Sequence, residues 1–316
     1  MAKQQDKNLS LQKLFLFGKT IAETVSEEIR KYSLSQSLGR FLKKRGRGGH
    51  QMKKGDFLSE KFLDIAIKKN LNFFSLNKVV VASEEQGVRI FKRKKDGAEI
   101  FLIIDPIDGS NNLRPHLTPA PFVAFSVALG NLSDLENKNN FEAISVAYIV
   151  DIFHQESWFA KKGGSAYFFQ KNLKKIFSLQ SSGETDLKKV IFGTSLDRFG
   201  SDFEKIHQQI LPILQATFCQ RRLGSTILDL CRVASGDYDI YFSPSGGVKI
   251  HDLAAVQLII KEAGGCLVFK EVKNFQPKGK FLQALILNRD KKVIRDTGFE
   301  IIAAGNKNLL KKIKKL

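Results

Sequence analysis

The sequence predicts a layered α/β protein, with an early antiparallel sheet followed by a half in which helices and strands alternate. Two observations support this fold class. Segments after residue 200 alternate between helix-like and strand-like patterns, which is typical of α/β packing. Four runs before residue 151 are rich in β-branched and aromatic residues and predict strands, at 79–83, 100–104, 122–129 and 144–150.

The remaining elements follow from apolar spacing. Apolar residues recur at helical spacing from Leu11 to about Tyr32, and a second helix is predicted over 57–70. A Gly- and Lys-rich loop at 45–55 separates these helices, and the polar segment 131–141 is typical of a hairpin loop. In the second half we expect helices near 203–215 and 225–235, a strand at 238–242, a helix at 252–263 and a strand at 266–269.

The 316 residues suffice for one large domain or a two-lobed unit, and no internal repeat or flexible linker is evident. We place the boundary near residue 180, giving an α+β lobe at 1–180 and an α/β lobe at 181–316. No stretch approaches the ~18 consecutive apolar residues of a membrane span. The first residues contain no long apolar region or small-residue cleavage site, so a secretion signal is not expected. The three cysteines form no CxxC pair. A cytoplasmic protein without a membrane segment is expected.

Basic residues exceed acidic ones by 51 to 32, a net charge of +19 that favours anionic partners. Phosphorylated metabolites and nucleic acid both satisfy this condition. The aromatic interleaving typical of RNA-binding segments is absent, so a solvated basic surface is favoured and nucleic acid is a minor alternative. The excess is concentrated at 43–54, 92–95 and 307–315.

The segment FLIIDPIDGSNN at 101–112 drives two carboxylates against the end of an apolar run. Pro106 biases Asp105 towards extended geometry, and Gly109 permits a sharp turn. Asp105, the Ile107 carbonyl and Asp108 would then offer hard oxygen ligands suited to Mg²⁺ or Mn²⁺. An Asx-rich turn that caps a helix explains the same residues equally well. The aspartate spacing excludes an EF-hand.

Two further segments carry acidic residues at comparable places. The strand-like run before Glu84 and Glu85 could bring these carboxylates to the same cation, although surface glutamates are the commoner outcome. Asp252 stands at the start of a predicted apolar helix that ends at Gly264. A helix N-cap would explain Asp252 without any metal.

Taken together and in this order, these motifs resemble those of the inositol monophosphatase-like family of lithium-sensitive magnesium phosphatases. DPIDGS resembles its central signature, ASEEQG its upstream glutamate motif and HDLAAVQLIIKEAGG its C-terminal motif. RRLGSTILDLCRVASGDYDIYF and KKGDFLSEKFLDIA resemble two further family segments, so the resemblance runs from about 54 to 305. The pattern is most similar to archaeal enzymes of the inositol monophosphatase/fructose-1,6-bisphosphatase type. It implies the αβαβα sugar-phosphatase fold.

The resemblance also implies a cofactor, namely two or three Mg²⁺ ions for which Mn²⁺ could substitute. One ion would be held by Glu84, Asp105 and the Ile107 carbonyl. A second would be held by Asp105, Asp108 and Asp252, and lithium would compete there.

Catalytic and substrate-binding roles follow from the same resemblance. Glu84 and Ser110 would activate the attacking water, and Asp56 would occupy the outer part of the metal site. Independently of the resemblance, the positive charge of Arg221, Arg222 or Lys249 could bind extra phosphate on a substrate, although solvated surface charge also explains these residues. The remaining substrate contacts would come from Asp108, Gly109, Ser110, Gly224 and Ser225.

The expected activity is therefore Mg²⁺-dependent hydrolysis of a small polyol or sugar phosphate, with inositol 1-phosphate as the leading substrate. Fructose 1,6-bisphosphatase and 3′(2′),5′-bisphosphate nucleotidase are enzyme alternatives, and an RNA- or ribosome-associated regulator is a remote one. A homodimer is implied by resemblance alone. Ser243 or Ser245 replaces a carboxylate common in inositol-binding relatives, which puts the alcohol half of the substrate in question. His251 replaces a frequent Trp, a change expected to cost little.

Overall fold

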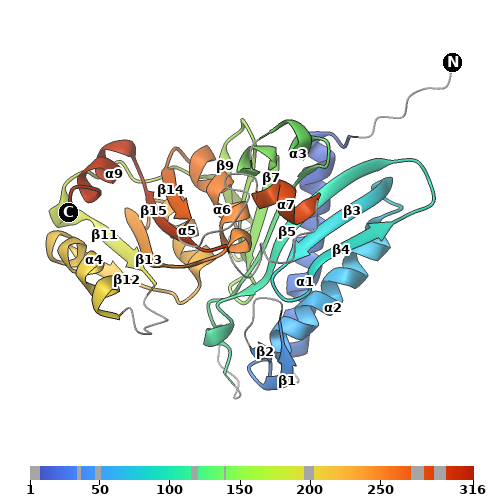
Figure 1. Ribbon diagram of the computed structural model, residues 1–316, viewed down its shortest axis with the longest axis horizontal. Helices are drawn as coiled ribbons and strands as arrows, with labels where there is room; N and C mark the ends of the chain where they lie inside the picture. The colour runs from blue at the N-terminus through green and yellow to red at the C-terminus, as the bar shows by residue number, and fades with distance from the viewer. Residues whose placement is uncertain are drawn as a thin grey trace.

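Helices and sheets alternate in five layers, as the computed structural model shows (Figure 1). Helices α1 and α2 cover one face of an eight-stranded sheet, and α5 and α6 lie between that sheet and a five-stranded one. Helices α4 and α9 contact the five-stranded sheet. The αβαβα arrangement expected from the resemblance is confirmed. The structure describes residues 8–33, 37–46, 51–114, 120–138, 140–195, 203–271, 281–287 and 297–316.

The eight-stranded sheet has the order β10-β9-β8-β7-β6-β5-β3-β4. Every neighbouring pair is antiparallel except β3 and β5, which run parallel. Its strands are β3 (Leu76–Ser83), β4 (Gly87–Lys92), β5 (Ala98–Asp108), β6 (Ala124–Asn131), β7 (Val146–Asp151), β8 (Glu156–Lys161), β9 (Ala166–Gln170) and β10 (Lys175–Ser178).

The five-stranded sheet is mixed and has the order β12-β11-β13-β15-β14. Its strands are β11 (Ile191–Thr194), β12 (Cys219–Arg221), β13 (Ile240–Val248), β14 (Cys266–Glu271) and β15 (Phe299–Ala304). A separate hairpin joins β1 (Phe41–Arg45) to β2 (Gln51–Lys53).

The described residues also form three short 3-10 helices, written η. The α-helices are α1 (Leu11–Ser33), α2 (Lys54–Asn70), α3 (Asp134–Asn137), α4 (Phe203–Ala216), α5 (Thr226–Ala234), α6 (Ile250–Glu262), α7 (Phe281–Ile286) and α9 (Lys307–Ile313). The 3-10 helices are η1 (Ser110–Asn112), η2 (Asn140–Ala143) and η3 (Leu187–Lys189). None of the described helices has the length and apolar character that a bilayer crossing requires.

The central strands are buried on both faces, because each face meets a helical layer. On β3, Val79 and Val81 face α1 and α2, whereas Val80 and Ala82 face the layer of α5 and α6. This alternation follows from the two-residue period of a strand. It also explains why these strands read as nearly continuous apolar runs rather than as alternating ones.

Most predicted elements are present, with differences that have physical causes. The 131–141 connection joins antiparallel strands as expected, but it contains α3 and part of η2. The 45–55 loop contributes to a hairpin, although 47–50 lie outside the described residues.

The chain passes from the eight-stranded sheet to the five-stranded sheet between Ser178 and Ile191, near the proposed lobe boundary at 180. One apolar core includes residues from both sheets, so the two lobes share a common interior.

Candidate metal centre and phosphate pocket

Two carboxylates leave the ends of neighbouring parallel strands at the same level. The register of β3 and β5 pairs Ser83 with Ile104, and Glu84 and Asp105 follow these residues directly. Parallel strands present their carboxyl ends at one edge of a sheet, so the backbone itself brings the two acidic residues together. Asp105 is 1% exposed.

A β-bulge then turns Asp105 and Asp108 towards one side. The pairing of β5 with β6 is regular up to Asp105 and resumes at Asp108, with an irregularity between them that contains Pro106. Pro has no N–H to offer a neighbouring strand and is tolerated at such bulges. The Ile107 N–H donates to Asp105 Oδ1 at 3.0 Å, which fixes the carboxylate.

The first turn of α6 adds the remaining groups from the middle helical layer. Asp252 is not the helix N-cap that its sequence context allowed: Lys249 is the N-cap, and Asp252 lies at the third helical position. The Lys249 N–H donates to Asp252 Oδ2 at 2.6 Å. Asp252 Oδ1 lies 3.7 Å from His251 Nε2, so both side chains share one region.

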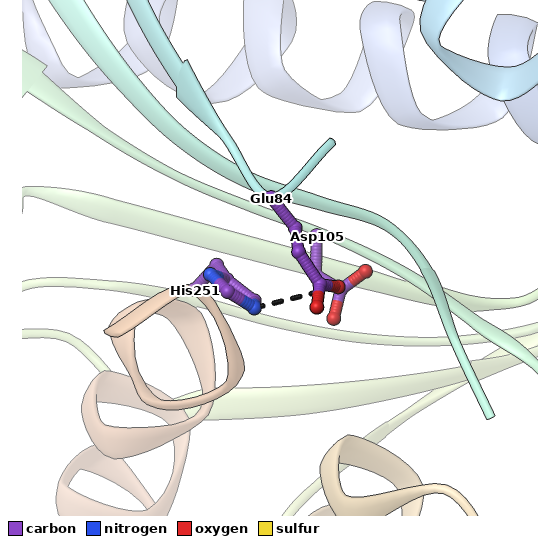
Figure 2. A group of neighbouring side chains, drawn as sticks. All are labelled: Glu84, Asp105 and His251. Carbon is purple, nitrogen blue, oxygen red and sulfur yellow. Dashed lines mark ion pairs between the residues drawn. The ribbon is translucent and has the colours of Figure 1, made fainter. Parts of the chain in front are cut away.

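These residues form two overlapping clusters of potential metal ligands. One comprises Glu84, Asp105 and His251, and the other comprises Asp105, Asp108 and Asp252. Within each cluster the ligand atoms lie within 4.8 Å of one another, and Asp105 belongs to both. Figure 2 shows Glu84 and His251 pointing towards each other beside Asp105, with 3.4 Å between Glu84 Oε2 and His251 Nε2.

Burial and mutual repulsion raise the pKa of the clustered carboxyls. Burial, with Glu84 and Asp108 nearby, holds the pKa of Asp105 well above its usual value. Burial, followed by the charge of Asp252, raises the pKa of Asp108 to about 7. Burial also raises the pKa of Asp252. Burial would lower the pKa of His251, but Glu84 and Asp252 raise it to about 9.

Two turns that meet at this site, one after β5 and one before α5, each require glycine. Gly109 has φ +82°, and an added Cβ would lie 2.8 Å from the Phe122 carbonyl oxygen. Gly224 has φ +78°, and a Cβ there would meet Asn112 Oδ1 at 2.8 Å. Asn112 Nδ2 donates to the carbonyls of Phe122 and Leu223, at 2.7 and 2.9 Å. This amide links the two glycine turns, a role that the sequence analysis missed.

The Asp108 carboxylate is hydrogen-bonded to the N-terminus of α5. The Ile227 N–H donates to Asp108 Oδ2 at 2.8 Å, and the Ser225 hydroxyl bonds to the same oxygen. Ser225 is the N-cap of α5 and is buried. A helix N-terminus favours a negative charge, so these contacts partly offset the cost of burying Asp108.

Most of the predicted site residues line one pocket of about 150 Å³. Ser195, Thr226, Ser243 and Ser245 add hydroxyl groups to the same wall. The predicted residues among its lining are Glu84, Asp105, Ile107, Asp108, Gly109, Ser110, Gly224, Lys249 and Asp252. The predicted residues Ser225 and Arg221 do not line this pocket. Ser225 is hydrogen-bonded to Asp108 instead. Arg221 is exposed on edge strand β12, and its Nη1 donates to the Gln220 carbonyl at 2.9 Å.

Asp56 lies beside the pocket but not in its wall. It occupies the third position of α2, where its Oδ2 accepts a hydrogen bond from the Lys53 N–H at 2.7 Å. Burial, partly offset by that hydrogen bond, raises the pKa of Asp56 to about 7, and the charge of Glu84 also contributes. Asp56 therefore lies within electrostatic reach of Glu84, which belongs to one of the two clusters.

The clustering of basic residues at 43–54 predicted that Lys53 would belong to a solvated surface, but Lys53 is buried. It is 5% exposed, and its Nζ donates to the Ser110 carbonyl at 2.5 Å and to Asn111 Oδ1 at 3.3 Å. The hairpin of β1 and β2 is thereby attached to the turn that follows Asp108. By contrast, the lysines of α9 are exposed, while Leu309, Leu310 and Ile313 are buried beneath them.

The donor set fits divalent cations. Buried like charges repel one another and lose hydration, and a cation offsets both costs. Carboxylate oxygens supply the ligands that Mg²⁺ and Mn²⁺ take, and the shared Asp105 suits a pair of ions. Glu84, Asp105, Asp108 and Asp252 would hold them, with Lewis-acid chemistry as the result.

The raised pKa values predict that the metal-free protein becomes less stable as pH rises. Asp108 has a pKa of about 7 in the folded protein against 3.8 for a free side chain, so folding favours its protonated form. Its contribution is present below pH ~4 and is lost as pH rises through 7. His251, raised from 6.5 to about 9, acts in the same direction at higher pH.

Thermal unfolding in EDTA between pH 4 and 9 measures this effect. We expect the melting temperature to fall across that range, and Mg²⁺ to raise it most at the alkaline end. A melting temperature that is independent of pH in EDTA, or equal stabilisation by Mg²⁺ at every pH, would contradict the proposed charge cluster.

Comparison with known proteins agrees with this geometry. A model of the inositol monophosphatase family matches residues 11–295. A bifunctional NADP phosphatase/NAD kinase of Methanococcus maripaludis is 32% identical over 216 residues, which cover 65% of this chain and 36% of that protein. A fructose-1,6-bisphosphatase/inositol-1-monophosphatase of Methanothermobacter thermautotrophicus is 28% identical over 187 residues, or 59% of this chain and 61% of the relative. The matches thus span less than two thirds of either relative's length.

The fold is also shared with solved structures. The extragenic suppressor protein suhB from Bartonella henselae superposes with a TM-score of 0.66 at 21% identity, covering 95% of this chain and 96% of that one. At this identity the likeness concerns the fold alone. Because the family model spans most of the chain, from α1 to beyond α7, the protein belongs to the inositol monophosphatase family.

Proposed function

We propose that the protein is a Mg²⁺-dependent phosphomonoesterase that hydrolyses a small polyol or sugar phosphate, with inositol 1-phosphate as the leading substrate. One observation carries the proposal. Asp105 is shared by two groups of side chains that could ligate a metal ion, and members of both groups line a pocket with Gly109, Ser110 and Gly224 in its wall. Such a shared carboxylate suits a pair of ions acting on one phosphate group.

The residues have distinct roles in this proposal. Divalent ions held by Glu84, Asp105, Asp108 and Asp252 would supply charge stabilisation and would lower the pKa of water. Glu84 and the Ser110 hydroxyl orient the attacking water, and Asp56 supports Glu84 from the outer side of the site. Backbone N–H groups of Gly109 and Ser110 bind phosphate oxygens. Ser225 and the N-terminus of α5 keep Asp108 in position, through the hydrogen bonds described above.

The pocket wall favours a polyol over a nucleotide as the alcohol half of the substrate. Ser195, Ser243 and Ser245 offer hydroxyl groups, and no Phe, Tyr or Trp is among the described residues that line the pocket. A purine base gains much of its binding energy from stacking on such rings. The wall therefore supports hydrogen bonding to sugar or inositol hydroxyls.

Bisphosphate substrates are the second candidate. Lys249 lines the pocket, and its Nζ donates to the Thr297 carbonyl at 3.2 Å, so an ammonium group lies near the site. The archaeal relative named a fructose-1,6-bisphosphatase/inositol-1-monophosphatase supports a bisphosphate as a candidate, and the one named an NADP phosphatase/NAD kinase supports a phosphorylated dinucleotide. A lobe boundary near 180, a homodimer and a cytoplasmic location are further parts of the proposal, and RNA binding by the basic surface is its remote alternative.

A substrate panel tests the proposal directly. Phosphate release is measured from inositol 1-phosphate, fructose 1,6-bisphosphate, 3′-phosphoadenosine 5′-phosphate and NADP, each with Mg²⁺, with EDTA, and with Mg²⁺ plus millimolar lithium. We expect the highest kcat/KM on inositol 1-phosphate, no turnover in EDTA and inhibition by lithium, because lithium would compete for the oxygens of Asp105, Asp108 and Asp252.

Different outcomes separate the alternatives. A nucleotide as the preferred substrate would contradict the argument from the pocket wall but keep the phosphatase assignment. Hydrolysis that persists in EDTA, after exhaustive removal of metal, would overturn the metal-dependent mechanism itself.

A further inference from the structure

The His251 side chain lies next to Glu84 and Asp105, so it does more than fill space beside Asp252. Its side chain is buried, with the residue 4% exposed, and belongs to the first turn of α6. Its Nε2 lies 3.4 Å from Glu84 Oε2, and it shares a potential metal-ligand cluster with Glu84 and Asp105. Figure 2 shows the ring pointing at the Glu84 carboxylate, with Asp105 beside it.

The separations suit joint coordination of one ion. Ligand atoms around an octahedral ion with bonds of 2.0–2.1 Å are about 2.9 Å apart when adjacent and about 4.2 Å apart when opposite. The 3.4 Å between Glu84 Oε2 and His251 Nε2 lies between these values. An ion between the two atoms would therefore need only small side-chain movements, because α6 and β3 already bring the groups together.

We propose that His251 Nε2 is a direct ligand of the ion held by Glu84 and Asp105, which gives this position a mixed nitrogen–oxygen donor set. The proposal rests on the metal site proposed above and refines its chemistry. The second position, formed by Asp105, Asp108 and Asp252, contains carboxylates alone.

The two positions would consequently differ in metal preference. Mg²⁺ prefers oxygen ligands, whereas imidazole suits transition metal ions, and Mn²⁺ accepts both kinds of donor. A nitrogen ligand therefore raises the affinity for Mn²⁺ relative to Mg²⁺ at the position of Glu84. We expect Mn²⁺ to occupy the mixed position first when both ions are present.

Pulsed EPR of bound Mn²⁺ provides a readout that activity does not. Electron spin-echo envelope modulation detects a nitrogen nucleus bonded to Mn²⁺, and labelling the protein with ¹⁵N-histidine changes the modulation only when histidine is the ligand. We expect histidine nitrogen coupling in the wild-type protein at one equivalent of Mn²⁺. This measurement needs no mutation and so holds even if a variant fails to fold.

Two variants assign the signal among the five histidines of the chain. His251→Gln should abolish the nitrogen coupling and weaken Mn²⁺ binding by at least the ~10–100-fold that is typical for loss of a mere supporting partner. Mg²⁺ binding should weaken less. His207→Gln removes an imidazole from the exposed face of α4 and should leave the coupling and both affinities unchanged.

The outcomes distinguish this proposal from the function it rests on. Mn²⁺ that binds without histidine coupling would overturn the role of His251 but leave the carboxylate site intact. Tighter binding of both ions by His251→Gln would also overturn it, since His251 would then act as a cation that competes for Glu84. Failure of the wild-type protein to bind any divalent ion would overturn the metal site as a whole.

Discussion

Replacing Asp105 by Asn should reduce phosphatase kcat/KM by about 10⁴-fold or more, since removal of a single electrostatic stabiliser typically costs about 10²–10³-fold. We expect a larger loss of kcat/KM for Asp105→Asn because of where Asp105 lies. Asp105 contributes an oxygen to both ligand clusters, so its substitution weakens both at once. Steady-state kinetics with saturating Mg²⁺, combined with calorimetric measurement of Mg²⁺ binding, checks both parts of the prediction.

The same variant should fold, and in EDTA it should be at least as stable as the wild-type protein. Asn retains an oxygen that can accept the Ile107 N–H, and it cannot ionise within a cluster whose burial and mutual repulsion raise the pKa of Asp105. Asp151→Asn is a suitable control, because Asp151 is buried in β7 of the same sheet but belongs to neither cluster. A fully active Asp105→Asn protein would end the two-ion interpretation.

Glu84→Gln should lower kcat by about 10²–10⁴-fold, the usual contribution of a group that activates water, with little change in KM. Glu84 lies at the end of β3, level with Asp105, and its carboxylate faces the pocket. Orienting water matters in the transition state more than in substrate binding, which is why kcat carries the effect. The measurement is a full kcat and KM determination on the preferred phosphate ester.

The neighbouring glutamate provides a matched control. Glu85 does not line the pocket, and burial together with the charge of Glu84 raises its pKa to about 8. Its carboxyl is therefore largely protonated at pH 7, and Glu85→Gln should leave kcat nearly unchanged. If Glu84→Gln changed KM alone, or if Glu85→Gln had the larger effect on kcat, Glu84 would not be the residue that orients water.

Much of the centre of this protein can be predicted from local sequence. Apolar runs that end in Glu84 and Asp105 predict buried strands with carboxylates at their ends, and the two strands are neighbours in the sheet. The Asp-Pro-Ile-Asp-Gly segment predicts an irregular turn, which the structure has as a bulge followed by Gly109 at φ +82°. These features depend on residues that are close along the chain, so backbone preferences decide them.

Residues that reach the site from distant segments could not be assigned in this way. His251 and Lys53 enter it because α6 and β2 are positioned by core packing, and Arg221 is left out because β12 is an edge strand. Asn112 connects two turns that are 111 residues apart. The sequence by itself determined the strands, the turn chemistry and the places of the acidic residues at the strand ends. Only the tertiary structure decided which basic and polar side chains meet them, because that depends on how helices pack between two sheets and not on any local pattern.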